Sequence, residues 1–241
     1  MDLSSSETLV SSLSYVESTG STNSDLVASG GNDLTVLVAG SQTAGKGRAG
    51  RQWVSPVGQS LSVSILLKPT FSEIGWLPLL AGLAMTRAVT RLGVPASIKW
   101  PNDVLVGEKK ISGVLSELVA PGVVVVGAGL NLAQSQSELP IPNATSMALE
   151  GVDVTVPLAL HAYLSEFVAL YKNFDAATLR EQVRESCGTL GQDVRAIMPG
   201  DTEVVGKAID IDADGRLLIN VASENTLYTV GAGDILHLRH N

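Results

Sequence analysis

The sequence predicts an α+β fold, with a mixed sheet and helices over residues 1–190 and a small SH3-like β-barrel over residues 191–241. Two long segments, residues 72–92 and the stretch that begins at Pro157, place apolar residues at helical spacing. The short apolar runs between these segments are typical of strands. After Gly191 the helical pattern stops, and short strand-like runs alternate with glycine-containing turns, which is typical of a small barrel.

The N-terminal part is expected to hold two strands and a short helix, after a polar start. Residues 1–14 are polar and rich in serine, which indicates a frayed start or a short helix. Residues 21–29 begin with three good N-cap residues and are predicted to form a short helix. Residues 34–40 form an apolar run typical of a buried strand. In residues 61–67 apolar side chains alternate with serines, which predicts a strand with two different faces.

The middle of the chain supplies the main helix and the rest of the first sheet. The helical spacing in residues 72–92 ends at a glycine, a common C-terminal signal. Residues 97–100 form a short strand before a proline. Residues 103–118 are predicted to form a hairpin that turns at Gly107. Residues 123–132 are apolar almost throughout, which predicts a central strand buried on both faces.

Two further helices and the barrel complete the predicted fold. A proline in the first turn and an apolar stripe predict a helix from Pro157 to Tyr171, and residues 176–186 are predicted to form a more polar helix. The barrel strands are expected in five runs, at residues 193–197, 203–211, 216–221, 226–230 and 234–238.

The composition argues against several classes of function. Of the 241 residues, 45% are hydrophobic, and the net charge of −8 disfavours a broad surface for nucleic acid or an anionic membrane. The longest apolar run, Gly122–Leu130, is much shorter than the roughly 20 residues of a membrane-spanning helix. The single cysteine, Cys187, excludes an internal disulfide framework. Because the N-terminus lacks the features of a signal peptide, we expect a cytoplasmic protein.

One loop concentrates glycine and positive charge in this acidic chain. The stretch "GSQTAGKGRAGRQW", Gly40–Trp53, contains Lys46, Arg48 and Arg51 among four glycines. Glycines let backbone N–H groups approach a ligand closely, and the cations can neutralise a phosphate or carboxylate. The loop matches neither the phosphate-binding pattern of P-loop proteins nor the dinucleotide fingerprint. A solvated surface loop with incidental charge is the alternative.

A second segment, "KWPNDVLVGEKKISG", adds polar groups to an apolar region. Pro101 fixes the chain at a strand end, so Asn102 and Asp103 are expected to project from a rigid corner. A carboxylate and an amide at such a corner suit Mg²⁺ or a nucleotide, although Asp103 could instead cap a turn. Lys110 lies across the predicted hairpin turn, which returns its side chain toward the same end of the sheet.

The motifs "STN", "SQTAGKGRAGRQW", "KWPNDVLVGEKKISGVLSEL" and "GAGLNL" occur in the order seen in biotin protein ligases. The chain therefore resembles that family, from about Ser18 to the C-terminal "GDILHLRH". Lys46 is a departure, because the family most often has arginine there and lysine cannot make bidentate contacts. The residues before Ser18 are too few for a helix-turn-helix module, so no DNA binding is expected.

The resemblance implies a fold of the biotin/lipoyl ligase type and a reaction in two steps. Biotin and MgATP give biotinyl-5′-AMP, and the biotinyl group then passes to one lysine of a biotin carboxyl carrier domain. Biotin and ATP are thus implied substrates, and Mg²⁺ is implied together with ATP. The carrier domain, from a biotin-dependent carboxylase, is the implied partner. The carboxylate of biotin and the α-phosphate repel each other, so cations are expected between them.

The resemblance also assigns residues by position. The implied catalytic pair is Arg48 and Lys110. The implied biotin contacts are Ser21, Thr22, Asn23, Gln42, Lys46, Gly47, Arg48, Lys110 and Gly113. The implied nucleotide contacts are Arg48, Arg51, Trp53, Asn102, Asp103 and Asn131, with Asn102 and Asp103 on the magnesium side. Helix capping by "STN" and plain core packing by Trp53 are the alternatives for those residues.

Three rival functions remain open. A lipoate or octanoate ligase would use the same acyl-transfer chemistry on a linear acyl chain. A non-enzymatic biotin sensor or transcriptional regulator would bind biotin without transferring it. A partner-binding module would depend on the C-terminal barrel, although the chemistry-bearing residues are concentrated upstream.

Overall fold

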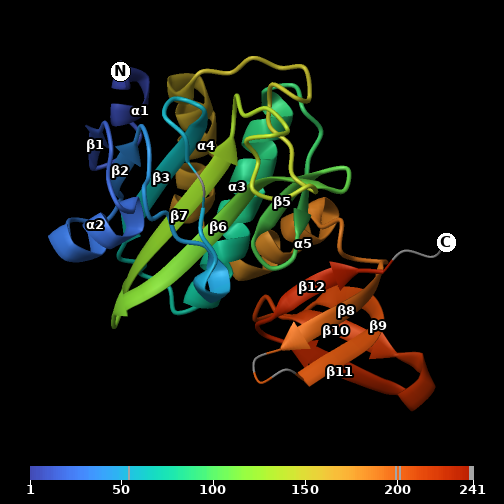
Figure 1. Ribbon diagram of the computed structural model, residues 1–241. Helices are drawn as coiled ribbons and strands as arrows, with labels where there is room; N and C mark the ends of the chain where they lie inside the picture. The colour runs from blue at the N-terminus through green and yellow to red at the C-terminus, as the bar shows by residue number, and fades with distance from the viewer. Residues whose placement is uncertain (54, 199, 201, 239–241) are drawn as a thin grey trace.

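The computed structural model describes residues 1–53, 55–198, 200 and 202–238 (Figure 1). The first sheet is built from β1 (Ser12–Val16), β2 (Thr35–Ala39), β3 (Ser60–Leu67), β4 (Ser97–Lys99), β5 (Asp103–Val106), β6 (Lys109–Ala120) and β7 (Val123–Asn131). Its spatial order is β1-β2-β3-β7-β6-β5-β4. The β1–β2 pair is parallel and the other pairs are antiparallel, so the sheet is mixed as predicted.

Helices cover the two faces of this sheet unequally. The helices are α1 (Ser4–Glu7), α2 (Thr22–Ser29), α3 (Leu77–Arg91), α4 (Val156–Lys172) and α5 (Ala176–Ser186). The pair α3 and α4 packs on one face, against β3, β6 and β7. The short helix α2 packs against β2, β3 and β7 on the other face, beside the glycine loop (Figure 1). That face is left partly open and carries the polar side chains described below.

Two sequence predictions needed correction. Residues 12–16 form β1, an edge strand, although residues 1–14 had indicated only a frayed start or a helix. The strand was missed because its serines and its half-buried positions on the sheet edge give no apolar run. The main helix is also shorter than residues 72–92, since a 3₁₀ turn, Ile74–Trp76, precedes α3.

The predicted hairpin and central strand are confirmed. The chain turns between β5 and β6 at Gly107, whose φ of 57° is a left-handed value that favours glycine. This turn sets Asp103 opposite Gly113 in the register and brings Lys110 back beside the start of β5. The strand β7 lies between β3 and β6 and is buried over most of its length.

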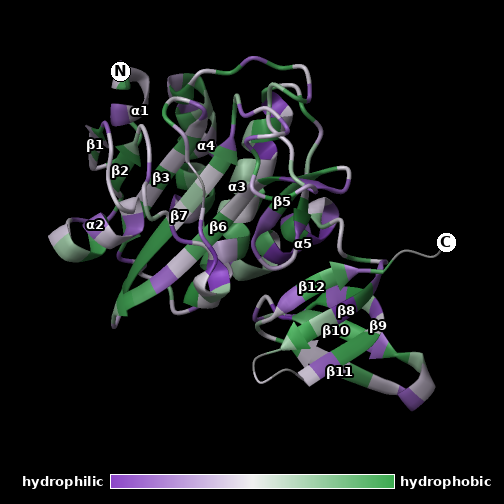
Figure 2. Cartoon of the chain, viewed as in Figure 1, coloured by the Kyte–Doolittle hydropathy of each residue, from purple (hydrophilic) through white to green (hydrophobic). Residues whose placement is uncertain are grey.

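The C-terminal region is a small five-stranded antiparallel sheet, as expected for the barrel. Its strands are β8 (Asp193–Met198), β9 (Thr202–Ile211), β10 (Leu217–Val221), β11 (Thr226–Val230) and β12 (Asp234–His237), in the order β11-β10-β9-β8-β12. Figure 2 shows that hydrophobic and hydrophilic residues alternate along these strands, so that one face of the small sheet can be buried.

Two tryptophans join the first sheet region to the C-terminal sheet. Trp76 and Trp100 are almost completely buried. The indole N–H of Trp76 donates to the carbonyl of Ala213 at 3.0 Å, and that of Trp100 donates to the carbonyl of Gly215, also at 3.0 Å. Buried N–H groups that find such acceptors avoid the cost of desolvation, so these contacts hold the two regions against each other.

The buried apolar side chains form one main cluster that extends through both regions. A small second cluster around Leu26 and Val125 lies under α2 on the other face of the sheet. Among the described residues, no helix is long and apolar enough to cross a membrane.

Candidate active site

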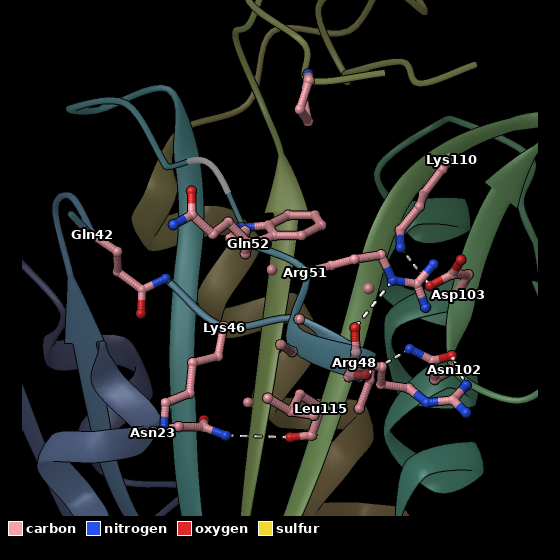
Figure 3. A pocket seen from close by; sticks show the side chains of 18 of the residues that line it. Asn23, Gln42, Lys46, Arg48, Arg51, Gln52, Asn102, Asp103, Lys110 and Leu115 are labelled. Atoms are coloured by element: carbon pink, nitrogen blue, oxygen red, sulfur yellow. Dashed lines mark hydrogen bonds and ion pairs between the residues drawn. The ribbon is translucent and has the colours of Figure 1, made fainter. Parts of the chain in front are cut away.

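A cavity of about 310 Å³ opens on the face of the sheet that α2 leaves partly uncovered. Figure 3 shows that its polar side chains come from α2, the glycine loop and the β5–β6 hairpin. Every residue that the sequence assigned to a site lines this cavity: Ser21, Thr22, Asn23, Gln42, Lys46, Gly47, Arg48, Arg51, Trp53, Asn102, Asp103, Lys110, Gly113 and Asn131. The structure therefore brings together segments that lie up to 110 residues apart in the sequence.

One side of the cavity carries uncharged polar groups whose orientation is fixed by their partners. The side-chain oxygen of Gln42 accepts the backbone N–H of Thr22 at 2.9 Å and lies 3.1 Å from the Thr22 hydroxyl. A backbone N–H can only donate, so the oxygen of Gln42 must face Thr22. Among the described residues, the Gln42 amide nitrogen has no hydrogen-bond partner. This side chain therefore offers donors to a ligand.

Asn23 is fixed with the opposite polarity. Its amide nitrogen donates to the Glu117 carboxylate at 2.7 Å and to the Leu115 carbonyl at 3.5 Å. Its oxygen accepts from the Ser64 hydroxyl at 2.6 Å. Because a carboxylate can only accept, the nitrogen must face Glu117, and one lone pair of the Asn23 oxygen remains for a ligand.

The other side of the cavity carries Arg48, Arg51 and Lys110, whereas Lys46 lies beside Asn23 (Figure 3). The Lys110 ammonium lies 2.6 Å from the Asp103 carboxylate and 5.9 Å from the centre of the Trp53 ring. The Arg48 guanidinium donates to the side-chain oxygen of Asn102 at 2.8 Å. Arg48 and Lys110 thus both contact the corner that follows Pro101, which is the end of the sheet to which the hairpin was expected to return Lys110.

The C-terminal sheet also reaches this loop. Arg48 donates to the carbonyl of Gly233 at 3.2 Å, and Arg51 forms an ion pair with Asp234 at 2.8 Å. Burial lowers the pKa of the Arg48 guanidinium from its usual value, while the nearby Asp234 carboxylate opposes this shift. The cations of the loop therefore have partners within the protein, including Lys46, which lies 3.6 Å from Glu117.

Two glycines on β7 make room for the side chains of the site. A Cβ atom on Gly127 would lie 2.2 Å from the Asn23 oxygen, and one on Gly129 would lie 2.1 Å from the Trp53 ring. Both distances are far below van der Waals contact, so these positions exclude any side chain. The side chains of Asn23 and Trp53 therefore occupy the space beside these two glycines.

Two family models match the chain. The first, the Biotin/lipoate A/B protein ligase family, matches residues 14–131. The second, the Biotin protein ligase C terminal domain, matches residues 189–238, which include the five strands of the small sheet. The chain is also 38% identical to a biotin--[acetyl-CoA-carboxylase] ligase of Mycobacterium tuberculosis, over 94% of this chain and 89% of that protein. The chain belongs to the biotin protein ligase family.

Further relatives agree with this membership. The bifunctional ligase/repressor BirA of Escherichia coli is 30% identical over 76% of this ligase, which covers 60% of BirA. Among solved structures, the biotin protein ligase from Aquifex aeolicus in complex with biotin and ATP superposes with a TM-score of 0.80 at 31% identity. That match covers 95% of this chain and all of the Aquifex chain.

Sequence reasoning missed several polar residues of the ligase. Ser64 and Glu117 bond to Asn23, and Asp234 pairs with Arg51. The signal for Ser64 was the alternation of serines in an apolar strand, because the serine face is buried as completely as the apolar face. The contact of Asp234 links residues 183 positions apart and leaves no local pattern in the sequence.

The predicted metal role of Asn102 and Asp103 stays untested, and the structure gives both side chains other partners. Asn102 accepts from Arg48, and Asp103 pairs with Lys110. Among the described residues, no group of three or more His, Cys, Asp or Glu side chains is placed to hold a metal ion.

Proposed function

We propose that this ligase forms biotinyl-5′-AMP from biotin and ATP and transfers biotin to a lysine of a biotin carboxyl carrier domain. The observation that carries the proposal is the fixed polarity of Asn23 and Gln42. A cyclic urea has N–H groups that need acceptors and a carbonyl that needs donors, and these two side chains offer one of each. Linear acyl chains such as octanoate or lipoate have neither group.

The cationic side supports the first step. In this proposal Arg48 and Lys110 neutralise the repulsion between the biotin carboxylate and the α-phosphate. They also stabilise the negative charge that develops on the phosphoryl group in the transition state. We propose that Arg51, Trp53 and Asn131 contact the nucleotide, so that ATP would bind next to Arg48 and Lys110. Asn131 already donates to the Thr145 carbonyl at 2.9 Å, which fixes its amide for such a contact.

We propose that Mg²⁺ reaches the site as part of the substrate MgATP. This ion keeps several waters and binds mainly through phosphate oxygens and one or two carboxylates, so a full protein cage is not needed. The second oxygen of Asp103 is the carboxylate oxygen that could join it. The carrier domain of a biotin-dependent carboxylase would bind afterwards, and we place the reaction in the cytoplasm without a role for DNA.

The experiment that tests the proposal compares ligands and products. Biotin at 100 times its dissociation constant is expected to stabilise the fold by about 2.7 kcal/mol and so raise its melting temperature, whereas lipoate and octanoate leave it unchanged. ATP-dependent transfer of biotin to a carrier domain, measured by mass spectrometry, then separates a ligase from a biotin sensor. A temperature rise with lipoate, or biotin binding without transfer, would contradict the proposal.

Replacing Gly129 by alanine is expected to raise the KM for ATP at least about tenfold, because the new methyl group displaces the Trp53 ring. The KM for biotin should change much less. Pyrophosphate release measured over a range of ATP concentrations gives the value. Gly82→Ala, where the new methyl group would meet no atom within 4 Å apart from the local backbone of its own helix, is the matched control. An unchanged KM for ATP in a folded Gly129→Ala protein would remove Trp53 from the nucleotide site.

A further inference from the structure

Glu117 lies on β6 just outside the residues that line the cavity of about 310 Å³, and it lines an adjoining hollow beneath the glycine loop. The motifs of the sequence give it no role. One of its carboxylate oxygens accepts from the amide nitrogen of Asn23 at 2.7 Å. The other lies 3.6 Å from the Lys46 ammonium in the glycine loop. A single side chain thus contacts both the uncharged side of the cavity and the loop that covers it.

The contact with Asn23 decides what that residue offers to a ligand. An isolated asparagine amide can turn over and present either its oxygen or its nitrogen. Here the amide nitrogen of Asn23 donates to Glu117 and to the Leu115 carbonyl, and its oxygen accepts from Ser64. Glu117 is the charged member of this set, and hydrogen bonds to a charged group are stronger than those between neutral groups.

We propose that Glu117 is a positioning residue that holds Asn23 with its oxygen toward the N–H groups of a cyclic urea. This inference rests on the proposed function, because the urea is that of biotin. Glu117 does not touch the ligand in this scheme, and its effect reaches biotin only through Asn23.

The pairing of Glu117 with Lys46 offers a competing explanation. If the carboxylate acted mainly through Lys46, its negative charge would matter more than its ability to accept a hydrogen bond. The two explanations separate in Glu117→Gln, which keeps an acceptor oxygen for Asn23 but loses the charge that attracts Lys46.

The test is a double-mutant cycle on biotin binding, measured by calorimetry on the full chain. Glu117→Ala is expected to weaken biotin binding about tenfold, and Glu117→Gln to bind within about threefold of the wild type. In an Asn23→Ala background, Glu117→Ala should cause no further loss. Kinetically, the KM for biotin should rise while the KM for ATP stays unchanged, which a general structural defect would not produce.

Two controls keep the result interpretable. Glu203→Ala removes another strand carboxylate with an ion pair of 3.6 Å, remote from the cavity, and should bind biotin normally. Glu117→Met keeps the side-chain length without a carboxylate and replaces Glu117→Ala if that variant does not fold. Equal losses in the presence and absence of Asn23, or a Gln variant as weak as the Ala variant, would overturn the proposal. A wild-type chain that fails to bind biotin would instead overturn the proposed function.

Discussion

Lys110→Ala is expected to slow formation of the adenylate about 100- to 1,000-fold while the protein stays folded. The ammonium group lies at the cationic side of the cavity, 2.6 Å from Asp103 and beside the Trp53 ring, where it can stabilise charge that develops in the transition state. The fold should survive because the ion pair of Lys110 with Asp103 is partly exposed and such pairs add little to stability. Biotin-dependent release of pyrophosphate measures the rate.

The neighbouring lysine provides the control for this prediction. Lys109 precedes Lys110 on the same strand but is exposed and lies outside the cavity, so Lys109→Ala should keep the wild-type rate. The melting temperatures of both variants show whether they are folded. A folded Lys110→Ala protein that releases pyrophosphate at near-normal speed would show that this lysine does not stabilise the transition state.

Arg48→Gly is expected to make less adenylate and to release a larger share of it into solution. The adenylate is a mixed anhydride, so it must be shielded from water until the acceptor lysine arrives. Arg48 holds the loop at this place through Asn102 and the Gly233 carbonyl, and its guanidinium would also lie over the acyl phosphate. Loss of these charge-assisted contacts should raise the released share at least about tenfold.

The released adenylate can be measured through the lysines that it acylates. The variant is incubated with biotin, MgATP and albumin as a bystander protein, and biotin on the albumin is divided by the total adenylate formed. Arg48→Lys keeps the charge but not the planar fork, so it should release an intermediate share. Bystander labelling at the wild-type level in Arg48→Gly would mean that another residue retains the intermediate.

The sequence predicted those parts of the fold that depend on local pattern. The helix at residues 176–186 ends where predicted, and the hairpin turns at Gly107, because caps, turns and apolar spacing act over a few residues. Strand β1 was missed because an edge strand of serines and half-buried residues carries little pattern. It forms because its backbone pairs with β2, which is a tertiary effect.

The residues that line the candidate site were predictable from the sequence, but the groups that support them were not. Motifs with unusual glycines and charges marked the cavity-lining residues, since few other functions place those residue types in an apolar context. The supporting groups were not predictable, because Ser64 and Glu117 look like ordinary strand residues until α2 and the loop cover them. The ion pair of Arg51 with Asp234 depends wholly on how the C-terminal sheet docks.

The docking of the C-terminal sheet has a consequence for how such units can be exchanged between relatives. Three of its contacts, those of Trp76, Trp100 and Arg48, end on carbonyl oxygens of the main chain. A main-chain acceptor survives the replacement of almost any side chain, provided that the backbone keeps its path. A graft from a distant relative should therefore fit if its turns have the same lengths, even where few of its amino acids are the same.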